Sequence, residues 1–214
     1  CNEMGRGRPC QAGRPRARSQ CRDGVSLRLA IFGGTFDPIH CAHLAVADEA
    51  SIAFRLDKVL FVVAANPPHK PGLKIESFHD RLRMAEIATA GQPLFEVSDI
   101  EAGTERSYSI FTIEKIRAGR TADDNLFFLI GADAFADIRS WYRWEDVMRS
   151  VEFIVAARPG HVFSIPSEAV VHRLDTLALE VSSSRIRAEL SAGGKPDEIA
   201  PEVLAYIREH GLYS

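Results

Sequence analysis

Apolar and polar residues alternate along most of the chain in blocks of strand length and helix length. Short runs of apolar, β-branched or aromatic residues predict strands at 27–32, 58–63, 95–97, 126–130 and 151–156. Longer stretches with apolar residues on one helical face predict helices at 42–54, 78–90, 108–118 and 201–209. Ser77 and Asp80 are placed to form a capping box at the start of the second helix.

The alternation of strands and helices predicts an α/β fold. The fully apolar runs at 126–130 and 151–156 are typical of strands buried on both faces of a parallel sheet. Strands separated by helices imply βαβ crossovers, and therefore a Rossmann-like, doubly wound and mostly parallel sheet with ligands at the carboxyl ends of its strands. From Val181 onward the sequence predicts a strand, a serine-rich turn and a small C-terminal helical part, with Gly193 and Gly194 ending its first helix.

Residues 1–26 differ from the rest of the chain. They are rich in Arg, Gly and Pro and almost lack large apolar residues, so they are predicted to form a disordered tail ahead of one domain at 27–214. The tail has a net charge of +4, and because the whole chain has a net charge of −3, the domain carries −7. An acidic domain does not indicate nucleic-acid binding, and a non-functional extension is the simpler interpretation of the basic tail.

Membrane and disulfide signals are missing from the sequence. No apolar run approaches the roughly 20 residues that span a bilayer, and no apolar segment typical of a secretory signal is present. Cys1, Cys10 and Cys21 lie in the tail at spacings that fit no zinc pattern, and Cys41 lies in the first predicted helix region. We therefore expect no membrane partner, no disulfide framework and a reducing cytoplasm.

The segment 29–43 has the pattern of an anion site. A predicted strand ends in Gly33 and Gly34, passes through a Phe-Asp-Pro turn and reaches His40 and His43 at the start of a helix. Glycines allow close backbone approach to a ligand, and a helix N-terminus favours negative charge. Histidines three residues apart share a helix face and could donate to the same phosphate. A metal pair or surface histidines would explain the spacing alone, but the strand, the glycines and the turn favour phosphate.

A second polar cluster lies near the C-terminus. Ser182, Ser183 and Ser184 are followed by Arg185 and Arg187. Serines before a helix commonly act as N-caps, and that interpretation stays open here. Hydroxyls, unpaired N–H groups and guanidinium groups would together also make a second phosphate cradle.

Both clusters resemble signatures of the nucleotidyltransferase superfamily that is related to class I aminoacyl-tRNA synthetases. The run G-G-T-F-D-P-I-H-C-A-H resembles G-x-F-D-P-x-H-x-G-H, with Ala42 where the signature has glycine, and V-S-S-S-R-I-R resembles I-S-S-T-x-I-R. In that superfamily the second signature holds the β- and γ-phosphates of ATP. The resemblance implies an ATP site that contains Gly33, Gly34, Thr35, Phe36, His40, His43, Ser182, Ser183, Ser184 and Arg187.

The sequence offers two phosphate cradles but no nucleophile and no general base. This combination indicates a phosphoryl transfer in which the substrate supplies the nucleophile. A phosphate of the second substrate, already ionised at pH 7, would attack the α-phosphorus of ATP. His40 and His43 would donate to the α-phosphate, Lys70 and Arg187 would offset charge on the phosphates, and Mg²⁺ would be held by phosphates rather than by side chains. A loop lysine is commonly only solvated, but the prolines at 67–68 stiffen the loop that carries Lys70.

Four further segments resemble bacterial nicotinate mononucleotide adenylyltransferases. They are N-P-P-H-K at 66–70, R-S-Y-S-I-F-T at 106–112, G-A-D at 131–133 and W-Y-R-W at 141–144. The resemblance covers essentially 27–213. It implies an enzyme of NAD biosynthesis that transfers AMP from ATP to nicotinate mononucleotide and releases pyrophosphate.

The same resemblance assigns residues to the two substrates. Trp141 would stack on the pyridine ring, and the backbone of Tyr142 and the side chain of Thr112 would hold the nicotinate carboxylate, with Lys70 also on the acceptor side. Asp133 would accept a hydrogen bond from a ribose hydroxyl, and Gly131 would leave room for adenosine.

Alternatives to this function remain at the level of sequence. A phosphopantetheine adenylyltransferase would share the fold but would not need Trp141 as a stacking partner. A non-catalytic nucleotide-binding module could keep both cradles without turnover. Trp144 is better explained by core packing than by ligand contact, and the sequence leaves open whether the protein is a monomer or a homo-oligomer.

Overall fold

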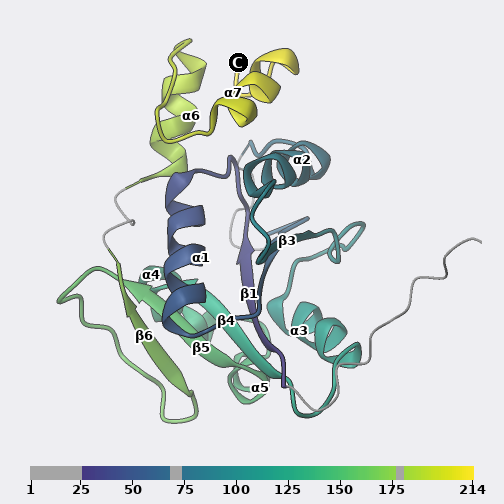
Figure 1. The fold of residues 1–214 in the computed structure, drawn as a ribbon, viewed down its shortest axis with the longest axis vertical. Helices are drawn as coiled ribbons and strands as arrows, with labels where there is room; N and C mark the ends of the chain where they lie inside the picture. The colour runs from purple at the N-terminus through teal and green to yellow at the C-terminus, as the bar shows by residue number, and fades with distance from the viewer. Residues whose placement is uncertain (1–25, 68–73, 177–180) are drawn as a thin grey trace, which may run out of the picture.

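The computed structural model describes residues 26–67, 74–176 and 181–214 and is built on one six-stranded sheet (Figure 1). Its strands are β1 (Arg28–Gly34), β2 (Lys58–Val63), β3 (Phe95–Ser98), β4 (Asn125–Gly131), β5 (Glu152–Ala157) and β6 (Val171–Asp175). The order across the sheet is β3-β2-β1-β4-β5-β6, and every neighbouring pair is parallel. The chain therefore winds outward in both directions from β1, which confirms the predicted doubly wound fold.

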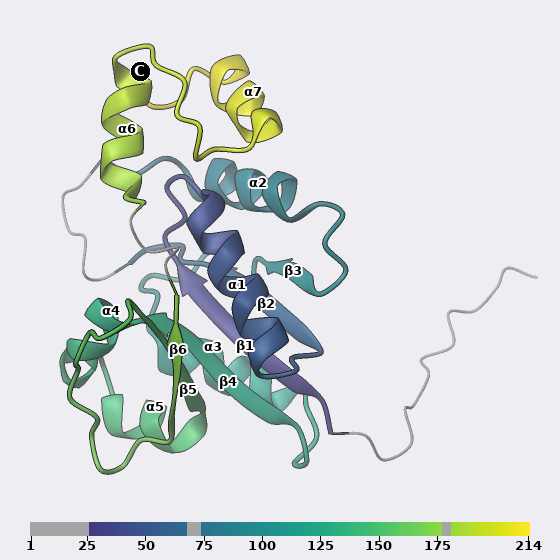
Figure 2. The ribbon, with the colours of Figure 1, turned by 60° about the vertical axis from the view of Figure 1, so that its left-hand side comes forward.

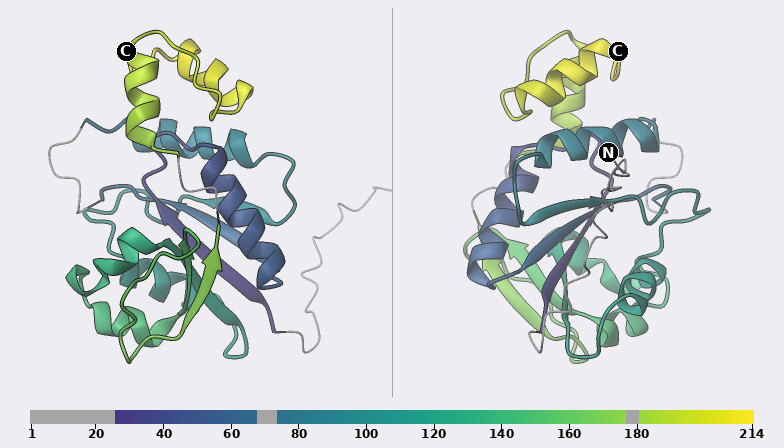
Figure 3. Two further views of the ribbon diagram at one scale, coloured as in Figure 1. Left: turned by 90° about the vertical axis from the view of Figure 1, so that its left-hand side faces the viewer. Right: turned by 45° about the vertical axis from the view of Figure 1, so that its right-hand side comes forward.

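Helices cover both faces of the sheet (Figures 2 and 3). On one face lie α1 (Cys41–Ala53) and α2 (Phe78–Thr89), with α6 (Ser183–Ser191) and α7 (Pro201–Glu209) beyond the ends of the central strands. On the other lie α3 (Ser109–Ala118), α4 (Ala132–Ala136), the 3₁₀ helix η1 (Ile138–Ser140) and α5 (Trp144–Ser150). Each face has its own buried apolar cluster, because strand side chains alternate between the two faces.

The parallel strands bring the predicted polar segments to one edge of the sheet. Gly34 ends β1 in register with Val63, and Gly131 ends β4 in register with Ala156. The segments that follow β1, β2, β4 and β5 consequently leave the sheet at the same side, which is where ligands bind in such folds.

Helix α2 begins where the sequence predicts and is joined to α7. The Ser77 Oγ accepts a hydrogen bond from the Asp80 backbone N–H at 3.1 Å, and the same hydroxyl donates to Asp80 Oδ2 at 2.6 Å. The reciprocal contact of a true capping box would use the Ser77 backbone instead. Asp80 Oδ1 accepts from the hydroxyl of Tyr206 at 2.9 Å, so this carboxylate also holds α7 against α2.

Several elements differ from the sequence-based expectation. The strand expected at Val181 is wrong: among the described residues Val181 and Ser182 pair with no strand, and α6 begins at Ser183. Strand β6 was not predicted, since its V-H-R-L-D sequence lacks the continuous apolar pattern. Within the described part of the chain it lies at the sheet edge and pairs with β5 alone. Helices α4 and α5 have only 5 and 7 residues, too few for a helical periodicity to be recognised.

Two predictions fall outside the described residues. The predicted tail at 1–26 lies there except for Ser26, and Lys70 lies in the gap between 67 and 74. The disordered tail and the role of Lys70 therefore stay predictions. Within the described ranges, no helix combines the length and the hydropathy needed to cross a membrane.

Candidate active site

The two histidines of the first motif stack on each other at the start of α1. His40 is the N-cap residue, and its ring centroid lies 3.7 Å from that of His43 with 27° between the ring planes. The backbone N–H of His40 donates to His43 Nδ1 at 3.3 Å. Because Nδ1 accepts this hydrogen bond, neutral His43 carries its proton on Nε2, and that atom can donate.

His40 is buried and uncharged at neutral pH. The residue is 6% exposed, and burial lowers the pKa of its side chain to about 4, although Glu198 nearby acts in the opposite direction. Its Nδ1 is buried and makes no hydrogen bond within the described part of the chain. A buried nitrogen of this kind normally finds a partner, so a ligand or a water molecule is expected to supply one.

Gly34 is required by the protein itself. A Cβ atom at Gly34 would lie 2.8 Å from the ring of Phe36, closer than side chains tolerate. Phe36 has a φ of 47° and packs its ring 5.0 Å from the ring of His43 and 5.7 Å from that of Phe32. The glycine thus makes room for an aromatic ring that supports His43, whereas the sequence suggested only close approach to a ligand.

The two motifs line one cavity of about 290 Å³. His40 and His43 come from the first motif, Ser183 comes from the second, and Gly131 at the end of β4 completes the polar edge. The remaining lining is Phe32, Ala42, Val46, Ala156 and Val181. Segments about 140 residues apart therefore meet at one site, although only Ser183 of the three predicted serines is part of this lining.

Arg187 joins the two motifs directly. Its Nη1 donates to the backbone oxygen of Asp37 at 2.7 Å and lies 3.8 Å from Asp37 Oδ2. Its Nη2 donates to Ser184 Oγ at 3.1 Å. Ser182 is the N-cap residue of α6 but makes no capping hydrogen bond with its side chain, so the capping alternative does not explain it.

A second cavity of about 310 Å³ adjoins the first along the sheet edge. Gly131 lines both cavities, and a Cβ atom built there would meet nothing within 4 Å, so the space beside Gly131 is open. Asp133 lines the second cavity from the first turn of α4. Arg158 and His161 line it from the loop after β5. Arg158 follows a predicted strand, so its position could identify it as a site residue from the sequence. Nothing in the sequence identifies His161 in this way.

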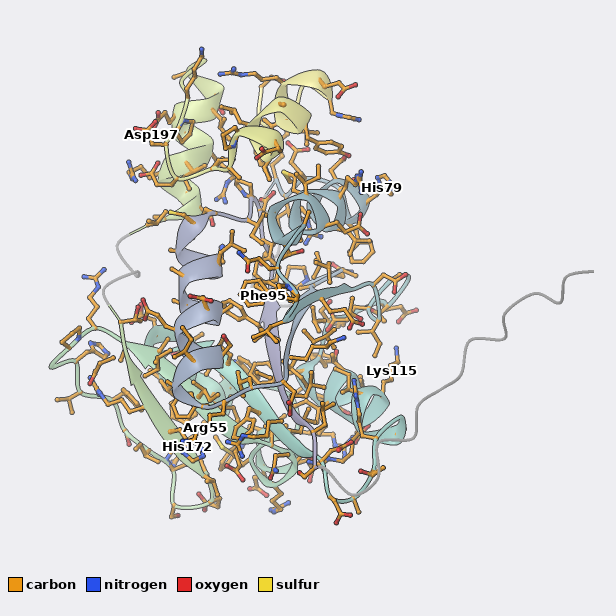
Figure 4. All side chains as sticks on the ribbon, viewed as in Figure 1. Arg55, His79, Phe95, Lys115, His172 and Asp197 are labelled. Carbon is orange, nitrogen blue, oxygen red and sulfur yellow. The ribbon has the colours of Figure 1, made fainter. Side chains whose placement is uncertain are left out.

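A third cavity of about 370 Å³ contains Thr112. The Thr112 hydroxyl donates to Glu101 Oε1 at 2.5 Å, and both side chains are buried. Lys115 on α3, labelled in Figure 4, lines the same cavity, and its Nζ donates to the Ile100 backbone oxygen at 3.4 Å. Sequence reasoning missed Glu101, because an acidic residue in a loop gives no signal of burial.

Trp141 and Tyr142 are not part of the described lining of this third cavity. Trp141 is half-buried and packs edge-on against Phe128 with 5.8 Å between ring centroids. Tyr142 is half-exposed, and its ring lies 4.6 Å from that of Tyr108 and 5.8 Å from that of Phe111. Tyr108 and Phe111 do line the cavity, so they connect Tyr142 to Thr112.

Arg81 is a further residue that sequence reasoning missed. It is 1% exposed and donates to backbone oxygens of Thr35 at 2.7 Å, Ala64 at 2.7 Å and Glu76 at 2.9 Å. It therefore joins the segments that follow β1 and β2 to the start of α2. Burial lowers its pKa, yet an arginine stays charged, and its buried charge is compensated by these carbonyl groups.

Comparisons with known proteins agree with this geometry. The cytidylyltransferase-like family model matches residues 31–189. A protein of Solibacter usitatus, named a probable nicotinate-nucleotide adenylyltransferase, is 58% identical over 188 residues, which cover 88% of this chain and 100% of that protein. A protein of Citrifermentans bemidjiense with the same name is 39% identical over 213 residues, which cover 87% and 98% of the two chains.

The fold has a close match among solved structures. The structure of Plasmodium falciparum nicotinic acid mononucleotide adenylyltransferase complexed with NaAD superposes with a TM-score of 0.72 at 23% identity and covers 87% of this chain and 97% of that one. At this identity the superposition shows the fold alone, while the two bacterial relatives are similar over nearly their whole length. The chain belongs to the nicotinate-nucleotide adenylyltransferase family of nucleotidyltransferases.

Proposed function

We propose that this chain transfers AMP from ATP to nicotinate mononucleotide, forming nicotinate adenine dinucleotide and releasing pyrophosphate in NAD biosynthesis. The observation that carries the proposal is the shared cavity of His40, His43 and Ser183 at the carboxyl edge of the sheet. The identity of the acceptor is inferred from the names of the bacterial relatives. The fold supports a nucleotide at this edge, where doubly wound sheets bind their ligands.

The chemistry needs alignment and charge stabilisation more than a base. The phosphate of the acceptor is ionised at pH 7 and can attack the α-phosphorus of ATP, while pyrophosphate leaves with the electrons of the broken P–O bond. His43 donates from Nε2 to the α-phosphate, because Nδ1 accepts the His40 backbone hydrogen bond. A donor fixed in this way requires no rearrangement as charge develops in the transition state.

The triphosphate and the adenosine occupy adjoining cavities in this proposal. Ser183 and the N-terminus of α6 bind the β- and γ-phosphates, and Arg187 contributes its guanidinium from the same helix. The adenosine lies beside Gly131, where the structure leaves open space, and Asp133 accepts a hydrogen bond from the ribose. Arg158, which lines the same cavity, adds positive charge near the phosphates.

The acceptor lies on the side of α3 and η1. Trp141 offers a ring face to the pyridine ring, and Thr112 with the backbone of Tyr142 binds the nicotinate carboxylate. Lys70 lies outside the described residues, and its proposed role is to offset charge on the leaving pyrophosphate and to bind the acceptor. In the structure the hydrogen of the Thr112 hydroxyl is directed to Glu101, so it must turn before it can donate to a carboxylate.

We include Mg²⁺ in the proposal as an ion that is bound by the phosphates of ATP and not by protein side chains. Among the described residues no three His, Cys, Asp or Glu side chains gather to hold a metal ion. The His43 ring N–H and the Ser183 hydroxyl can donate to phosphate oxygens, and the described lining offers no carboxylate to Mg²⁺, which prefers oxygen ligands and keeps several waters. When bound to ATP, Mg²⁺ would neutralise part of the triphosphate charge.

Pyrophosphate release tests the proposed reaction. The protein is incubated with ATP, Mg²⁺ and one of three acceptors: nicotinate mononucleotide, nicotinamide mononucleotide or phosphopantetheine. We expect pyrophosphate and nicotinate adenine dinucleotide in equal amounts with the first acceptor. Pyrophosphate release with phosphopantetheine alone would overturn the assignment of nicotinate mononucleotide as the acceptor. ATP binding without pyrophosphate release with any acceptor would indicate a non-catalytic module.

A further inference from the structure

The carboxylate of Asp37 lies at the centre of a buried hydrogen-bond network. Asp37 belongs to the Phe-Asp-Pro turn between β1 and α1 and is 3% exposed. Its Oδ1 accepts from the hydroxyl of Tyr213 at 2.8 Å and from the backbone N–H of Glu76 at 3.3 Å. Its Oδ2 lies 3.8 Å from Nη1 of Arg187. The turn that precedes His40 is thus stabilised by contacts with Tyr213 and Arg187 from the C-terminal part of the chain.

Tyr213, the next-to-last residue, is fixed at both its backbone and its side chain. Its N–H donates to Glu76 Oε1 at 3.0 Å, and its carbonyl accepts from the Ser191 hydroxyl at 2.7 Å. It adopts a φ of 61°, a left-handed conformation that is uncommon without glycine. Burial, reinforced by the Asp37 carboxylate, raises the pKa of Tyr213, so its hydroxyl stays a donor through the neutral range.

The Tyr213 hydroxyl and the Arg187 guanidinium both approach the Asp37 carboxylate, at 2.8 Å from Oδ1 and 3.8 Å from Oδ2. A buried carboxylate needs hydrogen-bond donors, and the shortest one here is Tyr213. Without that hydroxyl, the one donor left to Oδ1 from the described part of the chain would be the Glu76 N–H at 3.3 Å. The guanidinium of Arg187, now 3.8 Å from Oδ2, would then be drawn into a closer ion pair with Asp37.

We propose that Tyr213 is a positioning residue for nucleotide binding: its hydroxyl satisfies the Asp37 carboxylate and so keeps N–H groups of Arg187 directed to the triphosphate. The inference rests on the proposed function, because it assigns Arg187 to ATP. It predicts an effect on the nucleotide side alone. Among the described residues, the hydrogen bonds of Tyr213 go to Ser191, Glu76 and Asp37, and none of these lines the acceptor cavity, whose described lining runs from Glu101 to Lys115.

The test compares Tyr213→Phe with a matched control, Tyr206→Phe. Both substitutions remove a hydroxyl that donates to an aspartate, at 2.8 Å for Tyr213 and 2.9 Å for Tyr206, and both lie in the C-terminal part. Tyr206 joins α7 to α2 through Asp80 and does not reach Arg187. We expect Tyr213→Phe to raise the KM for ATP roughly threefold to tenfold with an unchanged KM for the acceptor. Tyr206→Phe should lower the Tm without shifting either KM.

An unchanged KM for ATP in folded Tyr213→Phe would overturn the inference, as would equal shifts in both KM values or the same shift in Tyr206→Phe. A second comparison uses Arg187→Ala, in whose background Tyr213→Phe should no longer raise the KM for ATP; a persisting increase would also overturn the inference.

If Tyr213→Phe does not fold, Ser191→Ala removes only the hydroxyl that holds the Tyr213 carbonyl. It should raise the KM for ATP about twofold, and no change would count against the proposal.

The inference and the proposed function fail in different ways. If the wild-type protein releases no pyrophosphate with any acceptor, the proposed reaction is wrong, and ATP affinity is measured by calorimetry instead. Weaker ATP binding by Tyr213→Phe than by Tyr206→Phe would then still support the positioning role. Equal ATP affinities of the two variants would contradict it, whatever reaction the enzyme catalyses.

Discussion

The proposed nucleotide side and the proposed acceptor side of this site are built differently. On the nucleotide side, His43 is fixed by the His40 backbone, and Arg187 is fixed by Asp37 and Ser184. On the acceptor side, Thr112 donates to a neighbouring carboxylate, and Tyr142 takes part in a half-exposed aromatic cluster. In the proposed assignment, the donors for phosphate are thus in place before ATP binds, whereas the acceptor side must rearrange its hydrogen bonds.

This difference follows from the ligands that the two sides would bind. Triphosphate oxygens are strong acceptors, and donors that are already oriented stabilise developing charge without reorganisation. A pyridine ring is recognised largely by stacking, which tolerates small changes in side-chain position.

The largest effect is expected from His43→Ala. Removing a transition-state donor costs about 2.7–4 kcal/mol, so kcat should fall by a factor of about 10²–10³ with little change in Tm. The control is His79→Ala, since His79 is exposed on α2 (Figure 4) and is not in the lining of the three cavities described above. A kcat within twofold of the wild type would remove His43 from the reaction.

The next effect concerns stability at low pH. Folding lowers the pKa of His40 from 6.5 to about 4, so between these values the unfolded chain binds a proton that the folded chain does not. The free energy of unfolding should therefore fall by about 2 kcal/mol from pH 7 to pH 5 because of His40. Urea unfolding of the wild type and of His40→Asn, which cannot titrate, measures this contribution. The same pH dependence in both proteins would show that His40 is not the cause.

A smaller effect is expected on the acceptor side from Trp141→Ala. Loss of stacking on the pyridine ring should raise the KM for nicotinate mononucleotide roughly tenfold and leave the KM for ATP unchanged. Trp144→Ala is the matched control, since Trp144 is also half-buried against the same apolar cluster. It should lower the Tm without a selective KM change. Equal increases in both KM values for Trp141→Ala would contradict the stacking role.

The smallest effect is expected from Glu101→Gln. The substitution removes a buried negative charge beside Thr112 and allows its hydroxyl to donate to a carboxylate. The ratio of kcat/KM for nicotinate mononucleotide over nicotinamide mononucleotide should rise about threefold. Glu105→Gln changes an exposed carboxylate of the same cavity and should leave the ratio unchanged. A ratio that falls in Glu101→Gln would indicate that the acid acceptor depends on this carboxylate.

The sequence predicts the parts of the structure that have a local cause. Strand β2 and helix α7 were predicted with the boundaries that the structure shows, because an apolar run and a proline-to-glycine span identify them. The paired histidines and the serine cluster were found because motif and helix start coincide. The edge strand β6 and the short helices α4 and α5 are stabilised by tertiary packing, which leaves little trace in local sequence.

The supporting residues could not be predicted for a related reason. Arg81 reaches Thr35 across 46 positions, and Tyr213 reaches Asp37 across 176. Nothing near Arg81 or Tyr213 in the sequence indicates these partners. The role of such residues exists only once the sheet and the C-terminal helices have been brought together.

A crystal structure with a non-hydrolysable ATP analogue and Mg²⁺ tests most directly whether the two motifs bind one triphosphate. We expect the α-phosphate within hydrogen-bond distance of His43 Nε2, and the β- and γ-phosphates at Ser183 and Arg187. A nucleotide bound only in the cavity between Glu101 and Lys115, or a triphosphate that contacts one motif without the other, would contradict the proposed site.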